Sequence, residues 1–154
     1  MMTLETIPSI KHQKDAQIQK ESLIDFDGSD AGNPVLRRVM SDLRTAQHEY
    51  GNYHNSVAEA WNALGLVRVH MQRDAKGAKM CHEEALRIYV SNKEHVETAI
   101  TLNDLGYCHE QLGEHNQALQ RYEEALTILS SLKLDESHPR MISTRRAVYR
   151  VRRE

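Results

Sequence analysis

Apolar residues recur at intervals of three and four positions along most of the chain from Pro34 onward. This spacing places them on one face of an α-helix and predicts helices at about 34–50, 56–72, 75–91, 96–112, 115–132 and 139–153. Pro34 suits a first helical turn, Ser56 is the expected cap of the second helix, and Gly113 suits the position after a helix end. The pattern requires no β-strand.

Two short phrases occur twice in the chain. The letters EEAL at positions 83–86 return at 123–126, 40 residues later, and the NxLG phrase at 62–65 returns at 103–106, 41 residues later. One extra residue is therefore expected in the first copy, between Met71 and Ala78. Self-similarity with this period is typical of stacked supersecondary units.

The repeated helix pairs resemble the tetratricopeptide repeat family. In that family the first helix carries a large apolar residue followed by Leu-Gly, and the second carries Ala, an aromatic residue and Ala. The small residues let helix backbones approach closely, and the large ones fill the space between them. The matching residues are Trp61, Leu64, Gly65, Ala78, His82 and Ala85 in the first copy, and Leu102, Leu105, Gly106, Ala118, Tyr122 and Ala125 in the second.

The long period is similar to that of kinesin light chain repeats, which tend to begin with His. His54, His95 and His138 stand 41 and 43 residues apart, so His138 marks a third repeat that ends after its first helix. Arg68 and His109 depart from the family pattern, which has an aromatic residue there. The resemblance implies an all-α, right-handed stack of antiparallel helix pairs, a tetratricopeptide-like solenoid over residues 34–154 with two full repeats and flanking helices.

Charge and composition add the outer segments to this picture. Residues 1–33 are acidic and rich in turn formers near their end, so we expect a flexible N-terminal tail. The net charge of −2 favours neither nucleic acid nor a membrane surface. Two cysteines make no disulfide framework, and no apolar run reaches membrane-spanning length. A cytoplasmic protein is the expectation.

The candidates for chemistry are weak. Cys81-His82-Glu83 and Cys108-His109-Glu110 look like a doubled ligand motif, but neighbouring side chains on a helix diverge, so each motif offers at most one ligand to a common site. The metalloprotease motif fails because Leu86 and Gly113 stand where a second His is needed. We expect no enzyme activity, no catalytic residue, no metal and no cofactor.

The resemblance implies protein–protein interaction as the function, as an adaptor or a small subunit of a larger assembly. In the family, the first helices of successive repeats line a concave face. Asn at equivalent positions suits the backbone of an extended peptide, and arginines near the end favour acidic residues in it. The predicted partner-binding residues are Asn62, Leu66, His70, Asn103, Asp104, Tyr107, Gln111, Arg146 and Arg150. Nucleic acid is not an expected partner.

The alternative is a repeat protein that associates with itself and uses no groove. About three repeats are normally needed for a stable stack, and the final helix has no second helix to cover it. Met141, Ile142, Val148 and Val151 would then form an exposed apolar strip. This reading predicts a homo-oligomer or a hetero-assembly through helix 139–153.

Overall fold

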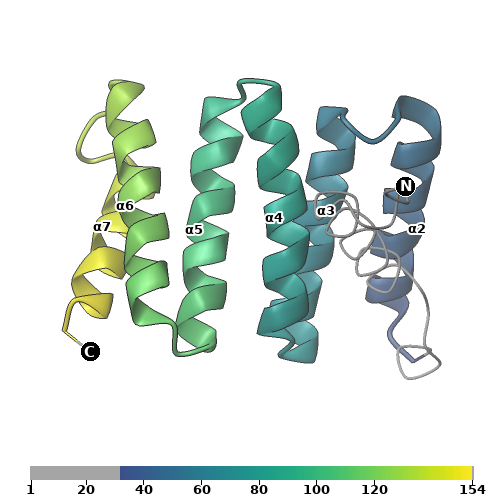
Figure 1. The fold of residues 1–154 in the computed structure, drawn as a ribbon, viewed down its shortest axis with the longest axis horizontal. Helices are drawn as coiled ribbons and strands as arrows, with labels where there is room; N and C mark the ends of the chain where they lie inside the picture. Colours follow the sequence, from purple (N-terminus) through teal and green to yellow (C-terminus); the bar gives the residue numbers. More distant parts are fainter. Residues whose placement is uncertain (1–31, 154) are drawn as a thin grey trace, which may run out of the picture.

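The computed structural model describes residues 32–153, and within that range every regular element is a helix (Figure 1). Of the predicted tail, only Gly32 and Asn33 fall inside the described residues. Asn33 caps the first helix, because its Oδ1 accepts hydrogen bonds from the N–H groups of Val35 and Leu36 at 3.0 and 3.2 Å. The elements are α2 Pro34–Tyr50, α3 Asn55–Val67, the π-helical turn η3 Arg68–Gln72, α4 Ala75–Ser91, α5 His95–Gln111, α6 His115–Ser131 and α7 Pro139–Val151.

The helices pack as a row in chain order. Each of them contacts the next one along the chain, and Figure 1 shows the row from α2 at one end to α7 at the other. The predicted all-α stack of helix pairs is confirmed. Within residues 32–153, no helix combines the length and the apolar character needed to cross a membrane.

Glycine allows the two helices of each repeat to approach closely. A Cβ atom added at Gly65 would lie 2.6 Å from the ring of His82, and one at Gly106 would lie 2.6 Å from the ring of Tyr122. These distances are too short for any side chain, so the aromatic rings occupy the space that glycine leaves. All six residues expected between the helices are buried: Leu64, Gly65, Ala85, Leu105, Gly106 and Ala125.

Histidine caps two of the helices. The prediction of Ser56 as the cap of α3 is wrong, because His54 has that role and its Nδ1 accepts the N–H of Ser56 at 3.2 Å. His138 caps α7 in the same way through the N–H of Arg140 at 3.3 Å. His95 is instead the first residue of α5. An unprotonated imidazole nitrogen accepts a backbone N–H as a hydroxyl does, although capping rules rank Ser far higher.

The extra residue of the first copy lies in the π-helical turn η3. Arg73 and Gly113 both follow their helices with positive φ, 56° and 73°, and are therefore equivalent. The insertion must therefore precede Arg73, which is compatible with only the first part of the range from Met71 to Ala78 that the sequence spacing predicted. A π-helical turn takes in one more residue than an α-turn, so it absorbs an insertion without breaking the helix.

The apolar strip predicted on the last helix is largely covered. Met141, Val148 and Val151 are 3%, 7% and 5% exposed, and only Ile142 remains open at 37%. Val148 and Val151 pack with residues of α6 that include Tyr122. The expectation of an exposed strip is therefore corrected: periodicity tells which face of a helix is apolar, but not that α6 covers it.

Candidate interaction face

The predicted partner-binding residues come from the first helix of each pair, that is α3 with η3, α5 and α7. Asn62 and Asn103 occupy equivalent positions, and both side chains are half-buried. Leu66 is 40% exposed and Arg146 is exposed, and neither residue lines one of the two pockets described below. The remaining predicted residues divide between those two pockets and one ion pair.

The two asparagines connect neighbouring repeats. The amide of Asn62 donates to the hydroxyl of Thr101 at 2.8 Å, and that of Asn103 donates to the hydroxyl of Thr144 at 2.9 Å. The Oδ1 of Asn62 also accepts a hydrogen bond from Nδ1 of His82 at 2.8 Å. Each amide nitrogen has two hydrogens, so each asparagine keeps capacity for a ligand beside its structural bond.

His82 is a buried neutral member of this network. Burial, and to a smaller extent the nearby His70, lower the pKa of His82 to about 4. The neutral ring carries one proton, and the Oδ1 of Asn62 can only accept a hydrogen bond, so this proton lies on Nδ1 of His82. The sequence placed His82 at a packing position but did not show that it would fix the amide of Asn62.

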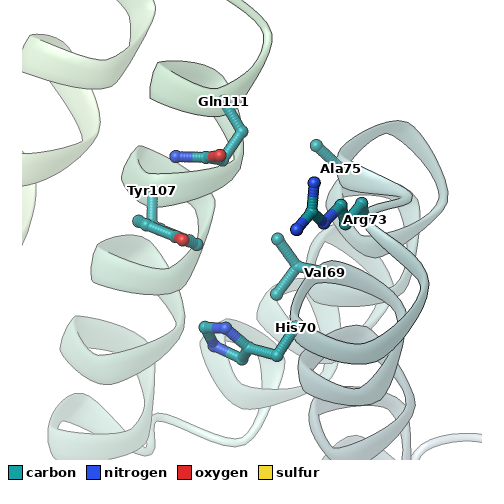
Figure 2. A pocket seen from close by; sticks show the side chains of 6 residues that line it. All are labelled: Val69, His70, Arg73, Ala75, Tyr107 and Gln111. Atoms are coloured by element: carbon teal, nitrogen blue, oxygen red, sulfur yellow. The ribbon is translucent and has the colours of Figure 1, made fainter.

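One pocket, which we name the π-turn pocket, lies between η3, the start of α4 and the end of α5 (Figure 2). Its volume is about 290 Å³. Figure 2 shows Arg73 and Val69 facing Tyr107 and Gln111 across one space. The ring centroids of His70 and Tyr107 lie 5.6 Å apart with an interplanar angle of 28°. The lining residues are Val69, His70, Arg73, Ala75, Tyr107 and Gln111.

The π-turn pocket therefore brings together three predicted residues, His70, Tyr107 and Gln111. Arg73 was missed, because it was assigned only to a turn. Alignment of the two repeats could have identified it. Arg73 occupies the position that Gly113 occupies in the second repeat, and a turn with positive φ favours glycine and requires no basic side chain.

A second pocket, which we name the α5–α7 pocket, has a volume of about 270 Å³. It brings together the predicted residues Asn103 and Asp104. Burial raises the pKa of Asp104 to about 6, even though the positive charge of Arg140 opposes this rise. The lining residues are Ile100, Asn103, Asp104, Tyr122, Arg140, Ser143 and Ala147.

Arg150 is held by an ion pair rather than left open. Its guanidinium donates to both carboxylate oxygens of Glu110, at 2.9 and 2.7 Å. Glu110 also accepts a hydrogen bond from the hydroxyl of Tyr122. Burial alone would raise the pKa of Glu110, but the hydrogen bonds from Arg150 and Tyr122 lower it. Of the two arginines predicted to bind a partner, Arg146 and Arg150, the second is thus neutralised within the chain.

Comparison of the sequence with models of known protein families identifies the repeated helix pairs. Residues 56–131, which span α3 to α6, match the profile of the tetratricopeptide repeat family. These residues are tetratricopeptide repeats. The chain has no match among curated proteins. The repeats identify a protein–protein interaction module, and the family is generally not catalytic.

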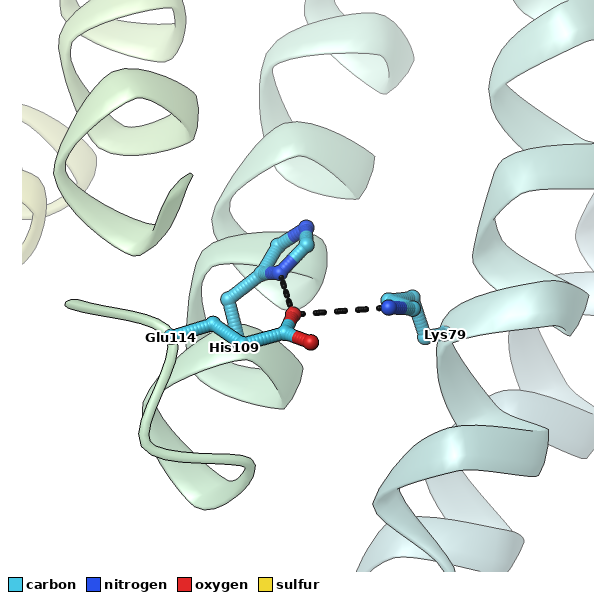
Figure 3. A network of polar contacts seen from close by, with 3 residues as sticks. All are labelled: Lys79, His109 and Glu114. Atoms are coloured by element: carbon cyan, nitrogen blue, oxygen red, sulfur yellow. Dashed lines mark hydrogen bonds and ion pairs between the residues drawn. The ribbon is translucent and has the colours of Figure 1, made fainter. Parts of the chain in front are cut away.

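Arg68 and His109, which stand where the tetratricopeptide repeat pattern has an aromatic residue, form equivalent polar contacts in the two copies. Arg68 donates to the carboxylate of Asp74 at 2.9 Å, and His109 donates from Nδ1 to Glu114. Lys79 of α4 donates to the same Glu114 oxygen at 3.4 Å (Figure 3). In both copies a side chain with a nitrogen donor replaces the aromatic residue and bonds the acidic residue before the next helix. Sequence reasoning missed this pairing, although the acids are visible at matching positions.

The two cysteines behave as apolar packing residues of the repeats. Cys81 and Cys108 are free and fully buried, and burial raises the pKa of each thiol to about 12. The protonated thiol is a poor ligand and a poor nucleophile. Within residues 32–153, no group of three or more His, Cys, Asp or Glu side chains is placed to hold a metal ion.

Proposed function

We propose that this tetratricopeptide repeat protein is an adaptor, or a small subunit of a larger assembly, that binds an extended peptide segment along the face of α3, α5 and α7. The observation that carries the proposal is the π-turn pocket. It unites three residues predicted from the repeat pattern, His70, Tyr107 and Gln111, with the unpredicted Arg73. Their contributions come from two successive repeats, as a segment running across the stack requires.

The chemistry of the π-turn pocket favours an acidic residue of the partner. Arg73 supplies a positive charge, Gln111 supplies an amide, and Tyr107 supplies a ring and a hydroxyl. None of the six described residues that line the pocket is acidic. The second amide hydrogen of Asn62 and the carbonyl oxygen of Asn103 would serve the backbone of the same segment.

Selection of random linear peptides displayed on phage tests this function. The test variant combines His70→Ala and Gln111→Ala, because both side chains are exposed and their loss should leave the fold intact. The asparagines are unsuitable, since their replacement would also remove bonds between helices. A matched control combines His48→Ala and Gln120→Ala, which changes the same residue types on exposed positions of α2 and α6.

We expect the parent and the control to enrich a common family of peptides that contain Asp or Glu. The test variant should bind those peptides about tenfold more weakly, or ~1.4 kcal/mol. Equal binding by all three proteins would place the binding surface elsewhere. Failure of the parent to enrich any peptide would contradict the peptide-binding function itself.

Self-association remains a second proposal on a narrower basis. Tyr149 of α7 is 64% exposed and Ile142 is 37% exposed, so α7 keeps two open apolar side chains. Light scattering at micromolar concentration distinguishes the states. A dimer that becomes a monomer with Tyr149→Ser would support association through α7, and a monomeric parent would contradict it.

A further inference from the structure

The α5–α7 pocket is lined by a carboxylate that has no hydrogen-bond or ion-pair partner among the described residues. Asp104 is half-buried in its wall, and the described residues provide it with no hydrogen bond and no ion pair within 4.0 Å. A partly desolvated carboxylate costs free energy when no protein group replaces the water that it loses. Acidic groups of this kind in a pocket are candidates for ligand binding.

The polar groups around Asp104 have acceptor capacity left over. Asn103 uses its amide nitrogen on Thr144, which leaves its carbonyl oxygen. Ser143 donates its hydroxyl hydrogen to the carbonyl oxygen of Arg140, which leaves the lone pairs of its own oxygen. Carboxylate, carbonyl and hydroxyl oxygens together match a ligand that brings hydrogen-bond donors.

The rest of the wall fits a positively charged side chain with an apolar stem. Tyr122 directs its hydroxyl to Glu110 and is only 3% exposed, so it contributes buried apolar surface to the wall of the pocket. Ile100 and Ala147 add apolar surface. The apolar stems of Lys and Arg pack on walls of this kind.

Arg140 is the internal competitor for this position. It is exposed and lines the same pocket, and its charge acts on Asp104 although no ion pair within 4.0 Å joins the two side chains. Asp104 therefore has a cation nearby but not in contact. An incoming cation that reaches hydrogen-bonding distance would gain the interaction that Arg140 does not make.

We propose that the α5–α7 pocket binds a Lys or Arg side chain of the partner segment, with Asp104 as its counter-charge. This inference rests on the proposed function and adds to it. The segment would present an acidic residue to the π-turn pocket and a basic residue to the α5–α7 pocket. Opposite charges at two places would fix the direction and register of the segment on the face.

Nuclear magnetic resonance with a minimal probe tests the pocket without a known partner. The probes are N-acetyl-arginine amide and, as the neutral control, N-acetyl-glutamine amide, each titrated into the full chain at neutral pH. We expect the arginine probe to shift the carboxyl resonance of Asp104 and to bind about tenfold more tightly than the glutamine probe. The exposed Glu49 on α2 reports unspecific binding in the same spectrum.

Two variants complete the test. Asp104→Asn should lose the preference for arginine, and Asp104→Glu should keep most of it. The pocket assignment is overturned if the arginine probe shifts Glu49 as much as Asp104, or if Asp104→Asn retains the preference. In peptide selection, Asp104→Asn should still enrich acidic peptides through the π-turn pocket but lose the basic residue. Failure of this inference is thereby separate from failure of the peptide-binding function.

Discussion

Asp104→Asn should stabilise the protein at neutral pH. Burial raises the pKa of Asp104 from 3.8 to about 6, and Arg140 offsets only part of this effect. A carboxyl group whose pKa is higher in the folded state takes up a proton on folding, so its ionised form lowers stability. Asparagine has the same shape without the charge, and it therefore removes this cost while the pocket stays filled.

The size of the effect follows from the pKa. A rise from 3.8 to about 6 corresponds to roughly 3 kcal/mol at full ionisation, at ~1.4 kcal/mol for each pKa unit. The parent has its full stability from this group below pH 3.8 and loses it as pH rises, until the loss is complete above about pH 6. Variant and parent should therefore be equally stable in acid and diverge toward neutral pH.

Urea unfolding followed by circular dichroism at a series of pH values measures this difference. Fluorescence of Trp61, which is 3% exposed, gives a second signal from the first repeat. Asp42→Asn is the control, because the side chain of Asp42 is 65% exposed and its loss should change stability by less than about 0.5 kcal/mol. If Asp104→Asn is no more stable than the parent at neutral pH, or if the difference is the same in acid, Asp104 is not desolvated.

The remaining predictions concern packing, pH and metal. Leu105→Ala should cost about 2–5 kcal/mol because Leu105 is 1% exposed, and a thermal melt equal to the parent's would contradict the repeat register. Gly106→Leu should lower the melting temperature further, since a Cβ there already meets the ring of Tyr122 at 2.6 Å; a smaller loss than that of Leu105→Ala argues against this contact. The hydrogen bond from His109 lowers the pKa of Glu114, so the ionised carboxylate stabilises the fold at neutral pH and this contribution is lost in strong acid. Glu114→Gln should therefore lower the melting temperature at neutral pH but not at strongly acidic pH. A difference that does not depend on pH would exclude a stabilising role of the ionised Glu114. Chelators should leave the melting temperature unchanged, and a clear drop with about one equivalent of zinc in the purified protein would show a structural metal.

The sequence alone determined the helices and their order. Apolar stripes with a period near 3.6 residues specify a helix wherever they occur. Pro34 and Gly113 mark helix ends, because the backbone conformation there depends on these residues and not on distant contacts. The EEAL and NxLG phrases showed that the pairs repeat, because each copy must solve the same packing problem. Leu64 and Leu105 are buried as that register requires.

Only the tertiary structure decided the partners of the polar side chains. Asn62 and Asn103 were predicted for a ligand, yet each also bonds a threonine about 40 residues away, which no local pattern reveals. Arg150 finds Glu110 on another helix, and α6 covers most of the apolar strip of α7. The sequence shows that an apolar stripe must be covered and that a side-chain amide can form hydrogen bonds. Which residue covers the stripe or bonds the amide depends on how the helices are stacked.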